Sequence, residues 1–149
     1  YDADVTYAFV VQEEVGCRGA SGAGFASNAD TAIVLEGTTA GDRSDVDPVR
    51  RVCEAGLGVV VSFMDNASMA DPHFFREMIA LAEKEKIRYQ VKRGCTGGND
   101  AGAFQRQAAG KKTCVLSVPC RYIHGPSSVM KLSDMEDQFL LAQAFARQA

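Results

Sequence analysis

Apolar runs and polar breaks alternate along the chain in a way that predicts strands and helices in turn. The first run, 5–12, joins β-branched and aromatic residues with almost no polar position, which is typical of a strand buried on both faces. Further apolar runs predict strands near residues 31–37, 59–64, 88–91 and 114–119. Because helical segments separate these strands, the pattern favours an α/β fold: a three-layer unit with a mixed, mainly parallel sheet.

The helical segments carry capping signals as well as periodicity. Asp71 is a natural N-cap, Pro72 suits the first helical position, and apolar residues then recur at helical spacing. Asn99 or Asp100 is expected to cap a second helix. The small-residue segment 18–27 is expected to form a third helix. The final helix opens with a capping box at 133–136 and is predicted to bury Met135, Phe139, Ala142 and Phe145.

Candidate chemistry falls where the predicted strands end. Glu13 and Glu14 follow the first strand, Glu36 ends the second, and His124 lies in the turn after the strand at 114–119. Open α/β sheets keep their active sites at such strand ends. Carboxylates with one imidazole suit zinc, cobalt or manganese. Since adjacent strand residues point to opposite faces, the two consecutive glutamates need a bend in the backbone before they can serve one site.

Four segments in this order resemble a known family: 11–16 with 18–20, 34–42, 97–102 and 118–124. The series is similar to the glutamyl/tetrahedral aminopeptidase family of dinuclear metallopeptidases, and the likeness covers essentially the whole chain. It corresponds to the C-terminal part of the family's catalytic domain. The resemblance therefore implies that residues 1–149 are a partial metallopeptidase catalytic domain with a zinc-exopeptidase-like fold. The chain begins at Tyr1 rather than Met, and we expect the N-terminal part and the dimerisation insert to be absent.

The resemblance also implies a role for each strand-end residue. Glu13 matches the general base, Glu14 and His124 match ligands of one divalent metal ion, and Glu36 matches a ligand of a second. Many relatives have Asp where this chain has Glu36. The resemblance further implies two ions of zinc, cobalt or manganese in the full-length protein. The glycine-rich residues Gly97, Gly98, Asn99 and Asp100 are interpreted as a substrate-binding loop that borders the peptide site.

The implied activity is that of a metal-dependent aminopeptidase, a hydrolase that removes N-terminal residues from short peptides through a metal-activated water. The family's bridging Asp and one His ligand have no counterpart in this chain, so we expect the isolated fragment to be inactive and metal-free, or to bind metal weakly. Two other classes stay open: a glycoside hydrolase using Glu13 and Glu36, and a non-catalytic binding module. Chelator-sensitive hydrolysis of an aminoacyl substrate separates the three.

The composition of the chain limits which kinds of binding partner are expected. A formal net charge of -3 without a basic cluster argues against nucleic acid, and no apolar run approaches the ~20 residues of a membrane span. The five cysteines are an odd number without a Cys-x-x-Cys pair, which favours reduced thiols in a cytoplasmic protein. Peptides and further copies of the same protein, as a homo-oligomer, are the expected partners.

Overall fold

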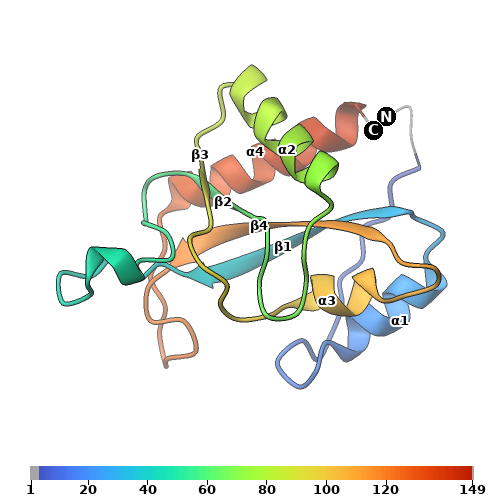
Figure 1. Cartoon of the computed structure of the whole chain (residues 1–149), viewed down its shortest axis with the longest axis horizontal. Coiled ribbons are helices and arrows are strands. Elements are labelled where there is room, and N and C mark those ends of the chain that lie inside the picture. The colour runs from blue at the N-terminus through green and yellow to red at the C-terminus, as the bar shows by residue number, and fades with distance from the viewer. Residues whose placement is uncertain (1–3, 149) are drawn as a thin grey trace.

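The computed structural model describes residues 4–148 and centres on a four-stranded sheet in the order β1-β4-β2-β3 (Figure 1). The strands are β1 (Thr31–Thr39), β2 (Val59–Ser62), β3 (Tyr89–Val91) and β4 (Lys112–Cys120). Strand β1 runs parallel to β4 and β2 parallel to β3, whereas β2 and β4 are antiparallel. The prediction of a mixed, mainly parallel sheet is confirmed.

Helices cover both faces of this sheet, which confirms the three-layer α/β prediction. Figure 1 shows α1 (Arg18–Ala26) and α3 (Asp100–Gln105) on one face, and α2 (Pro72–Lys84) and α4 (Leu132–Gln148) on the other. A short 3-10 helix, η1 (Pro48–Arg50), lies in the connection from β1 to β2. Within residues 4–148, none of the helices combines the length and the apolar character that a membrane crossing needs.

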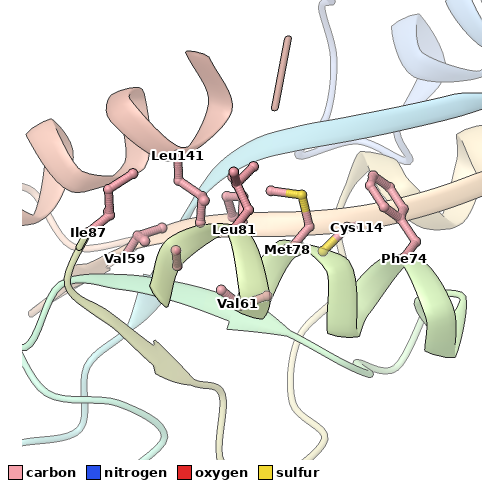
Figure 2. Packing of buried hydrophobic residues seen from close by; sticks show 10 residues of the cluster. Val59, Val61, Phe74, Met78, Leu81, Ile87, Cys114 and Leu141 are labelled. Atoms are coloured by element: carbon pink, nitrogen blue, oxygen red, sulfur yellow. The ribbon is translucent and has the colours of Figure 1, made fainter. Parts of the chain in front are cut away.

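The main core lies between the sheet and the helix pair α2 and α4 (Figure 2). The register that pairs Val61 with Leu116 brings apolar side chains of β2 and β4 together beneath these helices. The fully or nearly buried members of the cluster are Val59, Val61, Phe74, Met78, Leu81, Ala82, Ile87, Cys114, Leu116 and Leu141. Burying a side chain of this size contributes about 1.5–3 kcal/mol, so this half of the molecule anchors the sheet.

Helix α2 begins where its capping signal predicts. The Asp71 carboxylate accepts hydrogen bonds from the backbone N–H groups of His73 at 3.0 Å and Phe74 at 2.9 Å. Pro72 occupies the first turn, where a missing N–H group costs nothing. Helix α3 is capped by Asn99, whose side chain accepts from the N–H of Ala101. These local signals fix both helices in the chain.

Helix α4 is present, and Ala142 and Phe145 pack against the main core as predicted, but the other half of the predicted buried face is wrong. Met135 and Phe139 are exposed, and Asp134, Asp137, Gln138 and Leu141 face inward instead. The reason is that the polar side chains find distant backbone partners. Asp134 accepts from the N–H groups of Gly56 at 2.6 Å and Gly58 at 3.1 Å, and Gln138 donates to the carbonyls of Glu36 and Leu116.

The first predicted strand is also wrong. Residues 4–11 form no strand, and the apolar side chains in this segment are exposed, with Phe9 at 97%. A strand that is buried on both faces needs neighbouring strands, and among residues 4–148 none pairs with this segment. The edge of β1 that faces away from β4 likewise has no partner strand within that range. The apolar pattern of this segment suits a strand between two neighbouring strands, and no such neighbours are present among residues 4–148.

Candidate active site

A tight turn carries the two consecutive glutamates. Gln12 and Cys17 adopt left-handed backbone conformations with φ of 63° and 52°. The carbonyl of Glu13 accepts from the N–H groups of Gly16 at 3.1 Å and Cys17 at 2.9 Å, and α1 follows directly. The backbone therefore bends at the carboxylate pair, which frees Glu13 and Glu14 from the strict alternation of a strand.

Glu14 lies against His124, although the two residues come from opposite ends of the chain. The His124 Nε2 atom is 3.2 Å from the Glu14 Oε1 atom, and both side chains are largely exposed. His124 has a φ of 64° and sits in a turn closed by a hydrogen bond from the N–H of Gly125 to the carbonyl of Tyr122 at 2.9 Å. The fold thus brings one carboxylate and one imidazole to a single point.

Glu36 and Glu13 share one electrostatic environment. Burial first, and then the charges of Glu13 and Asp100, raise the pKa of Glu36 to about 7. Burial likewise raises the pKa of Glu13, followed by the charges of Glu14 and Asp100, while His124 lowers it. The charges of Glu14 and His124 therefore reach Glu13, and those of Glu13 and Glu14 reach Glu36, which lies inside β1.

The glycine-rich loop before α3 rests on the turn that begins at Asp65. The Asn99 side chain donates to the Asp65 carboxylate at 2.9 Å, and the same carboxylate accepts from the N–H groups of Ala67 and Ser68, each at 2.7 Å. A Cβ at Gly102 would lie 2.6 Å from the Ala67 carbonyl oxygen, so only glycine permits this contact. The loop that contains Gly97, Gly98, Asn99 and Asp100 is held rigidly as a result.

The structure adds Cys17 to this site, and the sequence gave no signal for it beyond a lone cysteine. Its Sγ atom lies 3.8 Å from the Glu13 Oε1 atom. Burial first, and then the charges of Asp100 and Glu13, raise the pKa of the Cys17 thiol to about 11. The thiol therefore stays protonated at neutral pH and acts as a weak hydrogen-bond donor to Glu13.

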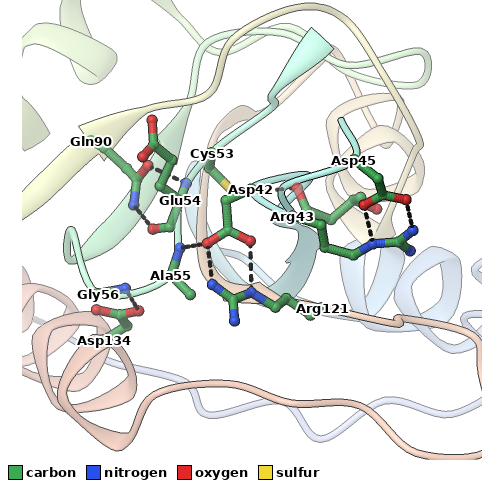
Figure 3. Close-up of polar contacts among 11 residues, drawn as sticks. Asp42, Arg43, Asp45, Cys53, Glu54, Ala55, Gly56, Gln90, Arg121 and Asp134 are labelled. Atoms are coloured by element: carbon green, nitrogen blue, oxygen red, sulfur yellow. Dashed lines mark hydrogen bonds and ion pairs between the residues drawn. The ribbon is translucent and has the colours of Figure 1, made fainter. Parts of the chain in front are cut away.

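An ion pair beside His124 was also missed from the sequence. Arg121 Nε and Nη2 donate to the two carboxylate oxygens of Asp42 at 2.7 and 2.9 Å, and Asp42 also accepts from the N–H of Ala55 (Figure 3). The hydrogen bonds from Arg121 lower the pKa of Asp42 to about 2. An open pocket of about 610 Å³ adjoins the pair, lined by Asp42, Arg43, Ser44, Asp45, Arg121 and Tyr122. The only signal in the sequence was that each of these two charged residues follows a predicted strand. In the structure those strands, β1 and β4, are parallel neighbours.

The donor atoms present suit a divalent metal ion in kind but are few in number. Glu14 and His124 offer one oxygen and one nitrogen at a shared point, and Glu36 offers a carboxylate nearby. Within residues 4–148 no three His, Cys, Asp or Glu side chains are grouped so that they could hold a metal ion. A catalytic zinc takes three protein ligands, and the Glu14–His124 pair offers two donors at one point.

Comparisons with known proteins find aminopeptidases that match nearly the whole chain. The model of the M42 glutamyl aminopeptidase family matches residues 1–141. The chain is 32% identical over 145 residues to a lysyl aminopeptidase of Pyrococcus furiosus, covering 97% of this chain and 40% of that protein. An aminopeptidase from Desulfurococcus kamchatkensis superposes with a TM-score of 0.91 at 31% identity, over 94% of this chain and 40% of the other.

A third similar protein is a Pyrococcus horikoshii peptidase that can assemble into a tetrahedron or a large octahedral shell. It superposes with a TM-score of 0.79 at 31% identity, over 93% of this chain and 39% of the other. The chain thus spans about two fifths of the length of the curated relatives that it matches. With the family model covering residues 1–141, the chain belongs to the M42 glutamyl aminopeptidase family.

Proposed function

We propose that the complete protein containing this chain is a metal-dependent aminopeptidase that releases N-terminal residues from short peptides. The observation that carries the proposal is the 3.2 Å contact between Glu14 and His124, with Glu13 and Glu36 in the same electrostatic environment. In this proposal, residues 1–149 are part of the catalytic domain, and an N-terminal part and a dimerisation insert lie elsewhere in the protein.

The proposed ligands are those that the family resemblance implies, and the contact between Glu14 and His124 supports them. Glu14 and His124 would hold one of two divalent ions, drawn from zinc, cobalt or manganese, and Glu36 would hold the other. When bound, such ions supply Lewis acidity, which lowers the pKa of a water molecule and polarises a carbonyl group. The longer side chain of Glu36, compared with the Asp of many relatives, keeps the negative charge and moves it by one methylene.

Glu13 has the position and the environment of a general base. It lies in the turn that also carries Glu14, and its partial burial raises its pKa toward the working range of a base. Glu13 takes a proton from the attacking water and passes it to the nitrogen of the leaving peptide. The loop residues Gly97, Gly98, Asn99 and Asp100 border the position where the peptide binds.

The assembly and compartment belong to the same proposal. A homo-oligomer is supported by the relative that assembles into closed shells. The five cysteines are free, which fits a reducing compartment, and we therefore place the protein in the cytoplasm. The 149-residue chain alone, with its incomplete ligand set, is proposed to bind metal weakly and to lack peptidase activity.

The test uses the complete protein and a panel of aminoacyl p-nitroanilides. We expect hydrolysis that a chelator abolishes and that zinc, cobalt or manganese restores. A blocked N-terminus on the same substrates is the matched control and should not be cleaved. Chelator-resistant cleavage of a β-glucan would favour the glycoside hydrolase alternative, and metal binding without any hydrolysis would favour a binding module. Neither alternative explains why His124 lies beside Glu14.

A further inference from the structure

His124 lies in a loop that its own side chains do little to hold. The loop runs from residue 121 to residue 129, and most of its residues after Arg121 are exposed. Among residues 4–148, the side chains of residues 122–128 form no hydrogen bond or ion pair except the contact of His124 with Glu14. The position of His124 therefore depends on how the base of the loop is held.

Backbone hydrogen bonds close the loop at its base. The N–H of Arg121 donates to the carbonyl of Val129 at 2.9 Å, and the N–H of Val129 donates to the carbonyl of Arg121 at 3.0 Å. Within the loop, Tyr122 and His124 adopt left-handed conformations with φ of 60° and 64°. Such conformations cost free energy in residues other than glycine and persist only where the surroundings hold them. A firm base at Arg121 is therefore needed to keep His124 in its orientation.

The side chain of Arg121 anchors this base to the segment after β1. Its two parallel hydrogen bonds to Asp42, at 2.7 and 2.9 Å, fix orientation as well as distance (Figure 3). The Asp42 side chain is 6% exposed and also accepts from the N–H of Ala55. Two residues earlier, the N–H of Ala40 donates to the carbonyl of Cys120 at 2.8 Å. Asp42 is thus a fixed partner, tied to the ends of both β1 and β4.

We propose that Arg121 is a positioning residue, whose paired hydrogen bonds to Asp42 orient the loop so that His124 is presented beside Glu14. This inference rests on the proposed function, in which His124 and Glu14 hold one divalent ion. Groups that orient a ligand side chain affect metal affinity although they do not touch the metal ion. A small rotation of the loop therefore weakens metal binding while the protein stays folded.

A second ion pair provides a matched control. Arg88 precedes β3, and its Nη2 atom donates to Asp137 of α4 at 2.7 Å, where the Asp137 side chain is 11% exposed. The other hydrogen bonds of the Arg88 guanidinium reach the carbonyls of Gly56 and Ser133, which lie outside the loop of residues 121–129. Loss of either arginine leaves a largely buried carboxylate without its cation, so both losses destabilise the protein. Only the loss of Arg121 affects the base of the His124 loop.

The test measures cobalt binding to the complete protein. Metal-depleted protein is titrated with Co²⁺ by calorimetry well below the thermal midpoint of every variant, and the visible absorption of Co²⁺ reports the coordination geometry. Arg121→Lys keeps the charge but cannot donate two parallel hydrogen bonds, so we expect about 3- to 10-fold weaker binding at one site and a changed spectrum. Arg121→Ala should weaken that site by about 10- to 100-fold. Arg88→Lys and Arg88→Ala should leave the affinities and the spectrum unchanged.

The other outcomes contradict the inference. Cobalt affinities and a spectrum that do not change in the Arg121 variants would mean that this ion pair only stabilises the fold. Equal weakening by the Arg88 variants would mean that general loss of stability causes the effect. The two lysine variants decide the question alone where an alanine variant does not fold.

Two measurements on the same protein separate failure of this inference from failure of the proposed function. Absence of peptide hydrolysis by the unmodified protein would refute the proposed function. Retention of both cobalt sites in His124→Ala would refute the proposed ligands together with this inference. Where hydrolysis occurs and His124→Ala loses one site, unchanged cobalt binding in the Arg121 variants overturns the role of Arg121 alone.

Discussion

Glu36 lies within β1 and Asp42 lies just beyond its end, six positions later, yet the two carboxylates have opposite electrostatic surroundings. Asp42 accepts two hydrogen bonds from Arg121 and one from the N–H of Ala55, and its pKa falls to about 2. Glu36 has Glu13 and Asp100 as charged neighbours, and burial together with these charges raises its pKa to about 7. One carboxylate is fully paired and the other is crowded by like charges.

The difference separates an acid that stabilises the fold from one that destabilises it. A carboxylate with a lowered pKa stabilises the folded state at neutral pH, whereas one with a raised pKa costs stability there. Crowding at Glu13, Glu36 and Asp100 has no structural benefit among the contacts described, and a bound cation would relieve it. The Asp42–Arg121 pair, in contrast, ties the loop after β1 to the turn that presents His124.

The largest effect is expected from the base. In the complete protein, Glu13→Gln should retain metal and lose about 10²–10⁴ in kcat, because a general base contributes that much to the rate. Glu14→Gln and His124→Ala should instead lose metal, measured by atomic emission after dialysis. Equal loss of metal in all three variants would contradict the division between base and ligands. Far-ultraviolet circular dichroism checks that each variant is folded.

The second largest effect is expected on stability, when the ion pair between Arg121 and Asp42 is broken. Arg121→Ala leaves Asp42, whose side chain is 6% exposed, without its cation, and should lower the thermal midpoint by roughly 5 °C at pH 7. The folded pKa of Asp42 lies below its ordinary value, so its stabilisation is complete above about pH 4 and disappears as the pH falls toward 2. The gap between variant and parent should therefore narrow in acid.

The control for this variant is Arg43→Ala, which removes an ion pair with Asp45 between two exposed side chains. Exposed pairs contribute little, so the thermal midpoint should not move measurably. A shift as large as that of Arg121→Ala would mean that burial of Asp42 is not what makes its pair important.

Removing the charge of Glu36 should change the thermal midpoint in the opposite direction and by a smaller amount. In metal-free protein at pH 8, Glu36→Gln should raise the thermal midpoint by roughly 2 °C, because it removes a partly buried carboxylate from its like-charged neighbours. The penalty is absent below about pH 4.5, where Glu36 is protonated in both states, and complete above about pH 7. Stabilisation of equal size at pH 4 would contradict this explanation.

Local signals in the sequence were sufficient for much of the fold. Asp71 and Pro72 predicted the start of α2 because a cap and its helix are neighbours in the chain. Asn99, one of the two caps expected for the next helix, likewise marks the start of α3. Such inferences need no knowledge of distant partners.

Features that depend on distant partners could not be predicted. The buried face of α4 is set by Asp134 reaching Gly56 and Gly58, and nothing in the helix sequence reveals those amides. The pairing of Asp42 with Arg121 depends on the register of β1 against β4. The apolar segment 4–11 satisfies the pattern of a buried strand, yet burial depends on neighbours that the pattern cannot supply.

The smallest effect is expected at Cys17, whose contact with Glu13 is a weak counterpart of the contact between Arg121 and Asp42. Arg121 donates to Asp42 at 2.7 Å with a full positive charge, whereas the Cys17 thiol reaches Glu13 across 3.8 Å. A thiol is a weak donor, so Cys17→Ala in the complete protein should lower kcat by no more than about threefold, near the lower limit for one hydrogen bond. Cys95→Ala, at an exposed thiol, is the matched control and should leave kcat unchanged. A loss above about tenfold at Cys17 would show that the thiol orients the base, and that Glu13 is positioned by a partner as Asp42 is.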